Sequence, residues 1–154
     1  MKPTDPPVNS AHPERGKGLV LPLSGKLPAG ILGLDSYIAA ATGSLTLTTS
    51  AADVTGVTVT LIKIGTYLIT AVFDMEHSVA GAGVAIGELV LGGTTQVGQA
   101  LAHEGAVRVT VPQVWLVTTT ALNTIAKLQA KKSINAGTAT ANVTHTKIVA
   151  LLVG

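Results

Sequence analysis

The chain has 154 residues, of which 12% are charged and 47% are hydrophobic, and its formal net charge is +2. An ordinary soluble domain carries about 25% charged residues, so a monomer of this composition would be short of solubilising groups. Cysteine is absent, which excludes a disulfide framework and thiolate metal sites. The composition therefore favours either a membrane protein or an oligomer that covers much of its own surface.

The membrane alternative is disfavoured by length. The longest weakly polar stretch, residues 79–91, contains three glycines, whereas a spanning helix needs about 20 apolar residues. A transmembrane β-barrel is disfavoured because both faces of the expected strands carry apolar residues. Behind Lys2 there is no apolar h-region, so we expect no secretory signal and synthesis in the cytoplasm of the host.

An extended arm is predicted over residues 1–34, because six of the seven prolines fall within the first 28 residues. Proline fixes φ and removes an amide donor, so this segment is not expected to form one regular element. Its second half alternates apolar anchors with proline and glycine, which favours adhesion to a partner or to a neighbouring sheet edge. The anchors expected to make that contact are Leu19, Val20, Leu21, Leu23, Leu27, Ile31 and Leu32.

Residues 35–154 predict one all-β domain, an antiparallel β-sandwich or jelly roll of eight to ten strands. Turn residues separate the strands, and Gly92-Gly93-Thr94 is a clear hairpin signal. Pro112 is expected to divide two strands, because a proline in mid-ladder would delete a hydrogen bond. The expected strands are 37–41, 45–49, 57–62, 67–75, 84–91, 96–102, 106–111, 114–120, 125–132 and 144–153.

Residues 67–75 are the best candidate for a central strand, because apolar side chains occupy both of its faces. Residues 125–132 alternate lysine or glutamine with alanine or leucine, the pattern of a strand with one wet and one dry face. The side chains expected in the core or at a trimer interface are Tyr67, Ile69, Phe73, Trp115 and Leu151.

The sequence predicts no catalytic, cofactor or metal site. Asp74, Glu76 and His77 lie close together, but in a strand His77 points to the opposite face from the two carboxylates, and nothing places His103 beside them. The glycines of residues 81–87 resemble a dinucleotide-binding turn, but that motif needs a following helix and here a strand is expected. We therefore expect a protein that is not an enzyme.

Lys127, Lys131 and Lys132 form the only local basic cluster. We interpret it as a solvated strand face or edge guard. Nucleic-acid binding usually needs a broader basic face, with aromatic platforms for single strands, and the chain has four aromatic residues. We expect no nucleic-acid partner. Trp115 lies in an apolar run, which favours a core or interface position over a carbohydrate site.

Two consecutive stretches carry a family resemblance: DVTGVTVTL at residues 53–61 and IGTYLITAVF at residues 64–73. Together they resemble the strand pattern of small trimeric jelly rolls of the tumour-necrosis-factor and complement-C1q type, above all the versions found in bacteriophage structural proteins. Residues 88–93 and 146–152 resemble further strands of that family. The resemblance implies a homotrimer, and an arm followed by a small jelly roll resembles phage capsid decoration (cement) proteins.

The leading hypothesis is therefore a structural virion protein that binds the outer capsid surface as a homotrimer and stabilises the shell, its arm latching onto neighbouring subunits. Its partners would be its own copies and the major capsid protein. The alternative is a receptor-binding, head-fibre or tail-fibre module, which the scarcity of aromatic residues disfavours. An extracellular C1q-like ligand is disfavoured by the missing secretory signal. Few Asn, Gln and Met residues and no Cys favour a heat-tolerant source, whereas the absence of the usual charge enrichment argues against one.

Overall fold

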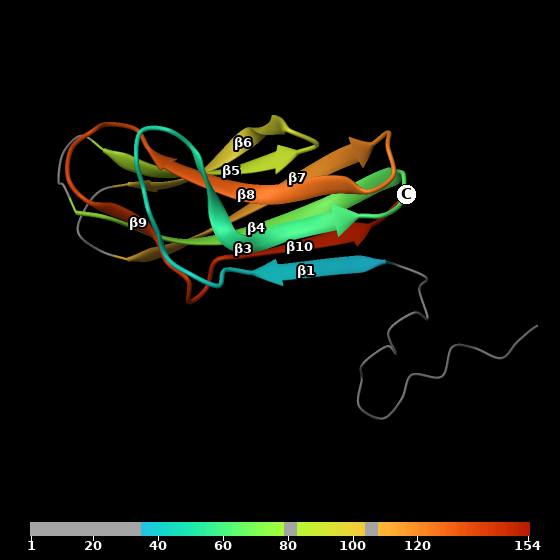
Figure 1. Ribbon diagram of the computed structural model, residues 1–154, viewed down its shortest axis with the longest axis horizontal. Coiled ribbons are helices and arrows are strands. Elements are labelled where there is room, and N and C mark those ends of the chain that lie inside the picture. The colour runs from blue at the N-terminus through green and yellow to red at the C-terminus, as the bar shows by residue number, and fades with distance from the viewer. Residues whose placement is uncertain (1–34, 79–82, 104–107) are drawn as a thin grey trace, which may run out of the picture. The chain divides into compact units, whose positions relative to one another are not determined.

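The computed structural model describes residues 35–78, 83–103 and 108–154. These residues form ten β-strands in two antiparallel sheets, with no helix among them. Figure 1 shows the sheets as two layers, with β5, β6 and β8 in the upper layer and β1 and β10 in the lower one. The predicted all-β sandwich is confirmed. The described ranges contain no helix long and apolar enough to cross a membrane.

Sheet A is built around β4 (Gly65–His77), whose 13 residues make it the longest strand. One edge of β4 pairs along most of its length with β7 (Val109–Thr119). The other edge pairs first with β10 (Lys147–Leu152) and then with β9 (Ala139–Ala141). β1 (Ser36–Ala40) lies outside β10, and the two-residue β2 (Leu45–Thr46) lies outside β9. The predicted central strand is thus central.

Sheet B has the order β3 (Ala52–Leu61), β8 (Thr124–Lys132), β5 (Val84–Leu91) and β6 (Thr94–His103). β5 has the bounds that the sequence predicts. It joins β6 through Gly92 and Gly93, whose φ values of 56° and 87° are both positive. Two left-handed residues between paired strands make the tight turn that suits the twist of a hairpin, so the predicted hairpin at this position is confirmed.

The core lies between the sheets and is filled by alternate residues of their strands. On β8, Ala126, Leu128 and Ala130 are buried while Lys127 and Gln129 face outward, which confirms the predicted wet and dry faces. The largest fully buried apolar side chains are Tyr67, Phe73, Leu61, Ile69, Met75, Leu89, Leu128 and Ile148.

Gly87 allows the two sheets to approach closely in the middle of the core. A Cβ atom at this position would lie 2.5 Å from Cδ1 of Phe73. The aromatic ring therefore packs directly against the backbone of β5. Because residues 84–91 form a strand and not a helix, the glycine-rich stretch does not have the structure of a dinucleotide-binding turn.

The prediction that Pro112 divides two strands is wrong. β7 runs through it, and Pro112 pairs with Val72 of β4. Among the described strands, β7 pairs with β4 alone, so half of its backbone nitrogens point away from that ladder. A proline at such a position removes no ladder bond, which is why edge strands tolerate it.

The last predicted strand, 144–153, begins too early, because the structure starts β10 at Lys147 and adds the short β9 before it. Residues 142–146 turn out of the ladder opposite Asp74. The amide of Asn142 donates to the Asp74 carbonyl over 2.7 Å, and the Asp74 amide donates to Oγ1 of Thr146 over 3.1 Å. The β-branched residues of this turn resemble a strand in sequence, while tertiary hydrogen bonds decide otherwise.

Candidate interaction surface

The outer face of sheet A, turned away from the core, is apolar over four adjacent strands. On β4 the core-facing residues alternate with an outward set that includes Leu68, Thr70 and Val72. The pairing register aligns this set with outward residues of β1, β10 and β7. We call this surface the apolar face; its large side chains are Ile38, Leu68, Val72, Val114, Leu116, Val149 and Leu151.

Three cross-strand rows make up the apolar face. They read Ser36, Leu151, Leu68, Leu116; then Ile38, Val149, Thr70, Val114; then Ala40, Lys147, Val72, Pro112. Lys147 is the one charged residue in these rows. Ile38 and Leu116 each expose 69% of their surface to solvent. A contiguous exposed patch of this kind marks an interaction surface in a soluble protein.

The outer face of sheet B is different, because it carries a row of polar side chains. Asp53, Gln129, Glu88 and Gln99 lie side by side across the four strands. Lys127 donates to Asp53 over 2.8 Å and Gln129 donates to the same carboxylate over 2.6 Å. Glu88 accepts from Lys131 over 2.7 Å and also from Gln99.

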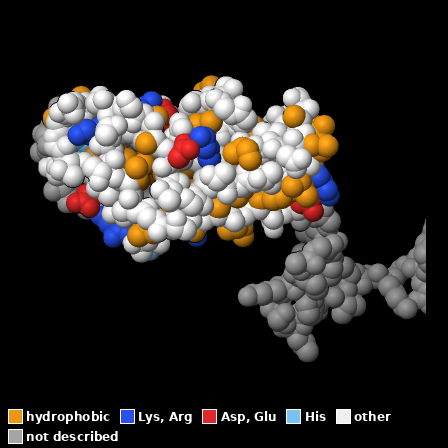
Figure 2. All heavy atoms as spheres, in the orientation of Figure 1, with side chains coloured by type: hydrophobic (Ala, Val, Ile, Leu, Met, Phe, Trp, Pro, Cys, Tyr) orange, Lys and Arg blue, Asp and Glu red, His pale blue; other side chains and the backbone are white. Residues whose placement is uncertain are grey.

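The two faces therefore differ in what they offer to water. The polar row of sheet B satisfies its own hydrogen bonds and remains compatible with solvent. The apolar face would leave its branched side chains in water unless another surface covered it. Figure 2 shows charged side chains in small separate groups among neutral and hydrophobic ones on the visible side of the domain. The covered surface expected from composition is best assigned to the apolar face.

A charged cluster lies at the rim of the apolar face, where β4 passes from β10 to β9. The side chain of Asp74 is 1% exposed. Arg108 holds both carboxylate oxygens, one through Nε at 2.6 Å and the other through its terminal nitrogen. Nδ1 of His145 lies 3.0 Å from Oδ2. This Asp74 clamp ties the start of β7 and the 142–146 turn to the middle of the sheet.

The clamp keeps Asp74 ionised. The hydrogen bond from Arg108 is the main cause that lowers the pKa of the Asp74 carboxyl below its ordinary value, and His145 acts in the same direction. Burial opposes this effect because it disfavours the charged form. The pKa of Arg108 is raised in turn by Asp74. A buried carboxylate without these partners would be costly, so the cluster acts as a unit.

The carboxylates and histidines noted in the sequence do not gather into a metal site within the described residues. No group of three or more His, Asp or Glu side chains suited to a metal ion occurs there. Asp74 lies on the outer side of β4, whereas His77 is buried on the core side. The side chain of His103 lies outside what the structure describes.

The lysine cluster separates into two environments. Lys127 and Lys131 belong to the polar row of sheet B, as the solvated-face interpretation expects. Lys132 instead points inward, is 9% exposed and donates to the carbonyl of Gly137 over 2.8 Å. The edge-guard interpretation is wrong for Lys132. The strand alternation that carries its two neighbours outward places this residue on the dry face.

Four of the five residues expected in the core or at an interface lie in the core: Tyr67, Ile69, Phe73 and Trp115. The Trp115 ring donates from Nε1 to the carbonyl of Gly98 over 3.2 Å, linking β7 to β6. Leu151 lies half-buried on the apolar face. The arm anchors Leu19, Val20, Leu21, Leu23, Leu27, Ile31 and Leu32 lie outside the described residues.

Sequence reasoning did not identify Ile38, Val114 and Leu116 as surface residues of one patch. Ile38 follows Tyr37, and Val114 and Leu116 flank Trp115, so apolar side chains occupy both faces of these strands and the local pattern does not indicate which face meets the core. The signal was the low charge of the whole chain, which indicated that some surface is covered. Register between strands far apart in sequence was needed to locate it.

No protein-family model matches this chain, and no curated protein matches it in sequence. Solved structures do resemble it. VP2 of infectious bursal disease virus, in a subviral particle, matches 78% of this chain with a TM-score of 0.55 and 14% identity, over 33% of its own length. Murine APRIL, a TNF-like jelly roll, matches 78% of this chain and 99% of its own at 7% identity, with a TM-score of 0.54 at pH 5.0. The described domain therefore has a β-jelly-roll fold of the kind found in viral capsid and TNF-like proteins.

Proposed function

We propose that this chain is a structural protein of a bacteriophage virion. It binds the outer surface of the capsid as a homotrimer and stabilises the shell, and its arm latches onto neighbouring subunits. It acts by assembly and not by catalysis. Its partners are its own copies and the major capsid protein.

The observation that carries the proposal is the apolar face. One sheet of the jelly roll carries a row of polar side chains that bond to one another, while the other carries three adjacent apolar rows with a single charge, a surface suited to protein contact. The buried centres of subunit interfaces are depleted of charge in the same way. The resemblance of residues 53–73 to trimeric jelly rolls supports three copies around one axis. A symmetric oligomer repeats each contact with every copy, so modest burial per chain adds up across a shell.

Binding to a shell tests the decoration role. The probe is a shell assembled from the major capsid protein encoded in the same genome. Full-length protein is expected to co-sediment with it at saturating stoichiometry, and the shell is expected to withstand higher temperature when decorated. Replacing Leu21, Leu23 and Leu27 by serine together is expected to weaken shell binding. If the wild-type protein stays in the supernatant at every concentration, the decoration role is wrong.

A further inference from the structure

One end of the sandwich carries exposed apolar side chains where turns are usually polar. In sheet A, this end holds the starts of β1 and β4 and the ends of β10 and β7. In sheet B, it holds the starts of β8 and β6 and the ends of β3 and β5. Figure 1 shows the carboxyl terminus at this end, beside the start of β1. We call it the arm end, because Asp35, where the arm of residues 1–34 joins the domain, lies here. Its exposed apolar residues are Ile62, Ile64, Leu122, Ile125 and Val153.

These side chains are too exposed to serve the core. Leu122 and Ile64 lie in turns between strands, where they are 63% and 57% exposed. Figure 2 shows hydrophobic side chains gathered at the corresponding end of the domain. Between Ile62 and Ile64, Lys63 forms an ion pair with Asp35 over 2.6 Å. The attachment point of the arm is thus held among the exposed isoleucines.

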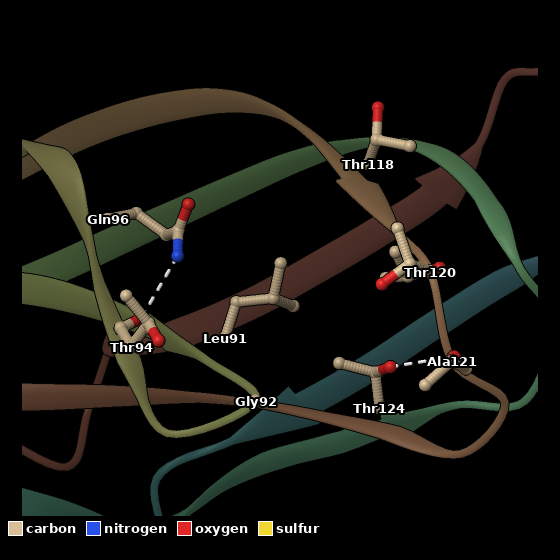
Figure 3. Close-up of a pocket in the computed structure, with 9 residues that line it drawn as sticks. Leu91, Gly92, Thr94, Gln96, Thr118, Thr120, Ala121 and Thr124 are labelled. Atoms are coloured by element: carbon tan, nitrogen blue, oxygen red, sulfur yellow. Dashed lines mark hydrogen bonds between the residues drawn. The ribbon is translucent and has the colours of Figure 1, made fainter.

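The arm end is also hollowed. A cavity of about 360 Å³ lies between the β5–β6 and β7–β8 turns. Figure 3 shows the Leu91 side chain standing in it, with Gln96, Thr118, Thr120 and Thr124 around it. A second hollow of about 510 Å³ adjoins the first across Gly92, Ala121 and Thr124, which line both, and includes Leu122 and Ile125. Together they form a groove with aliphatic patches and threonine hydroxyls beside them.

The arm has the chemistry that this groove fits. Residues 19–34 carry aliphatic anchors, no aromatic ring and one charge, Lys26. A segment interrupted by proline and glycine cannot pair its whole backbone within one regular element. The oxygen of a hydroxyl such as that of Thr124, which donates to the Ala121 carbonyl over 2.7 Å, can still accept from a backbone amide. The aliphatic surface of the groove would contact the side chains of the arm, and the hydroxyls would bond to the backbone of the arm. Peptide-binding grooves divide these two roles in the same way.

We infer that the apolar segment 19–34 of one copy docks in the groove at the arm end of a neighbouring copy. This inference rests on the proposed function, in which copies assemble and arms latch onto neighbours. In a cyclic oligomer each contact joins two different surfaces of the chain. The arm joins the domain at β1, and the groove lies beside the end of β7. These two strands lie on opposite edges of sheet A, so closure of a ring of subunits can bring the arm of one copy toward the groove of the next.

The reach of the arm is sufficient. Residues 19–34 span up to about 50 Å when extended, whereas the four strands from β1 to β7 are only about 15 Å across at the usual strand spacing. Assembly also holds the arm near the groove at a high effective concentration, so a weak groove can be occupied most of the time.

Limited trypsin digestion of the full-length oligomer tests the docking. Cleavage after Lys26 reports on the docked segment, and cleavage after Lys17 reports on the polar part of the same arm before it. Proteolysis follows the population of the open form, so cleavage after Lys26 is expected to be at least about tenfold slower than cleavage after Lys17. The variant Leu122→Ser/Ile125→Ser is expected to remove this protection. Val143→Ser, which removes an exposed apolar side chain from the turn between β9 and β10, is expected to leave it unchanged.

The absence of cysteine allows the neighbour to be identified. When Leu27→Cys and Leu122→Cys chains are co-expressed, a disulfide between the two chains is expected under oxidising conditions. A chain with both substitutions that links only to itself would overturn docking on a neighbour. Equal cleavage after Lys26 and Lys17 in the wild-type oligomer would overturn docking altogether, and protection that survives the Leu122→Ser/Ile125→Ser change would place the segment elsewhere, for instance on the shell.

Mass and shell binding, measured on the same samples, keep the two proposals apart. If the arm is protected in an oligomer that does not bind shells, the decoration role is wrong and the docking stands. If the arm is unprotected in a trimer that binds shells, the docking is wrong and the decoration role stands. The oligomeric mass of each serine variant is expected to equal that of the wild type, which separates lost docking from lost folding.

Discussion

Asp74 shows how one buried charge can organise a turn that the sequence alone does not reveal. Where β10 and β9 separate, the Asp74 backbone bonds to the 142–146 turn instead of to a paired strand. At the same point its side chain bonds to Arg108 and His145. Removing the carboxylate leaves Arg108 without its bidentate partner. Because Arg108 is partly exposed, water compensates for some of the loss.

Asp74→Asn is expected to lower the free energy of unfolding at pH 7 by about 1–2 kcal/mol, the range for a hydrogen bond to a charged group that solvent partly replaces. Urea unfolding monitored through Trp115 measures it. Asp53→Asn is the matched control, because the Asp53 carboxylate lies on the exposed row of sheet B and its ion pair is worth about 1 kcal/mol or less. An equal cost for both variants would contradict a special role for the clamp.

The clamp also fixes a pH dependence. The folded pKa of Asp74 is lowered from its ordinary value of 3.8, so the native state holds the charged form more strongly than the unfolded chain does. Its stabilisation is complete above pH 3.8 and is lost as the pH falls through the lowered folded value. Wild-type protein is therefore expected to lose stability more steeply in this acid range than Asp74→Asn. Parallel curves of unfolding free energy against pH would contradict the assignment.

Gly87 gives a second prediction at a single residue. Gly87→Ala places a methyl group against the Phe73 ring, and overpacking of a well-filled core costs about 1–3 kcal/mol. Thermal or urea unfolding measures the loss. Gly43→Ala is the control, because a Cβ there meets no atom within 4 Å, so its stability is expected to stay close to wild type. A neutral Gly87→Ala variant would show that Phe73 does not depend on the close approach.

The strands divide clearly into those that the sequence predicts and those that it does not. Residues 84–91 and the turn at Gly92 and Gly93 were predictable, because composition and turn chemistry point to the same structure. β9 was not predictable, because its three small residues have no apolar pattern and are held by pairing with β4. Pro112 was misread because its effect depends on whether β7 is an edge strand, a property of the whole sheet.

The apolar face gives a prediction for a strand surface. Leu116→Glu puts a carboxylate at the middle of the proposed interface, where it would be buried without a partner. Association between subunits is expected to weaken by at least about tenfold, or about 1.4 kcal/mol. Sedimentation velocity across a concentration series measures it. Val97→Glu is the matched control, because Val97 is also exposed but lies on β6 of sheet B. Equal dissociation of both variants would show that the apolar face is not special.

At the scale of the whole molecule, the low charge of the chain predicted that part of its surface is covered, and the structure locates the best candidate. Composition is a sum over all residues, so it does not indicate which part of the surface is covered. Ile38, Leu116 and Val149 become neighbours only through the order of strands in sheet A. The core residues were easier to anticipate, because Tyr67, Ile69 and Phe73 lie on one face of one long strand and local alternation is enough.

The central claim is that the apolar face is covered by other copies of the same chain. Sedimentation equilibrium of the full-length protein measures this most directly. The expected mass is three times the 15.5 kDa of one chain, constant over a wide range of protein concentration. A species of single-chain mass that stays monodisperse at high concentration would contradict the claim.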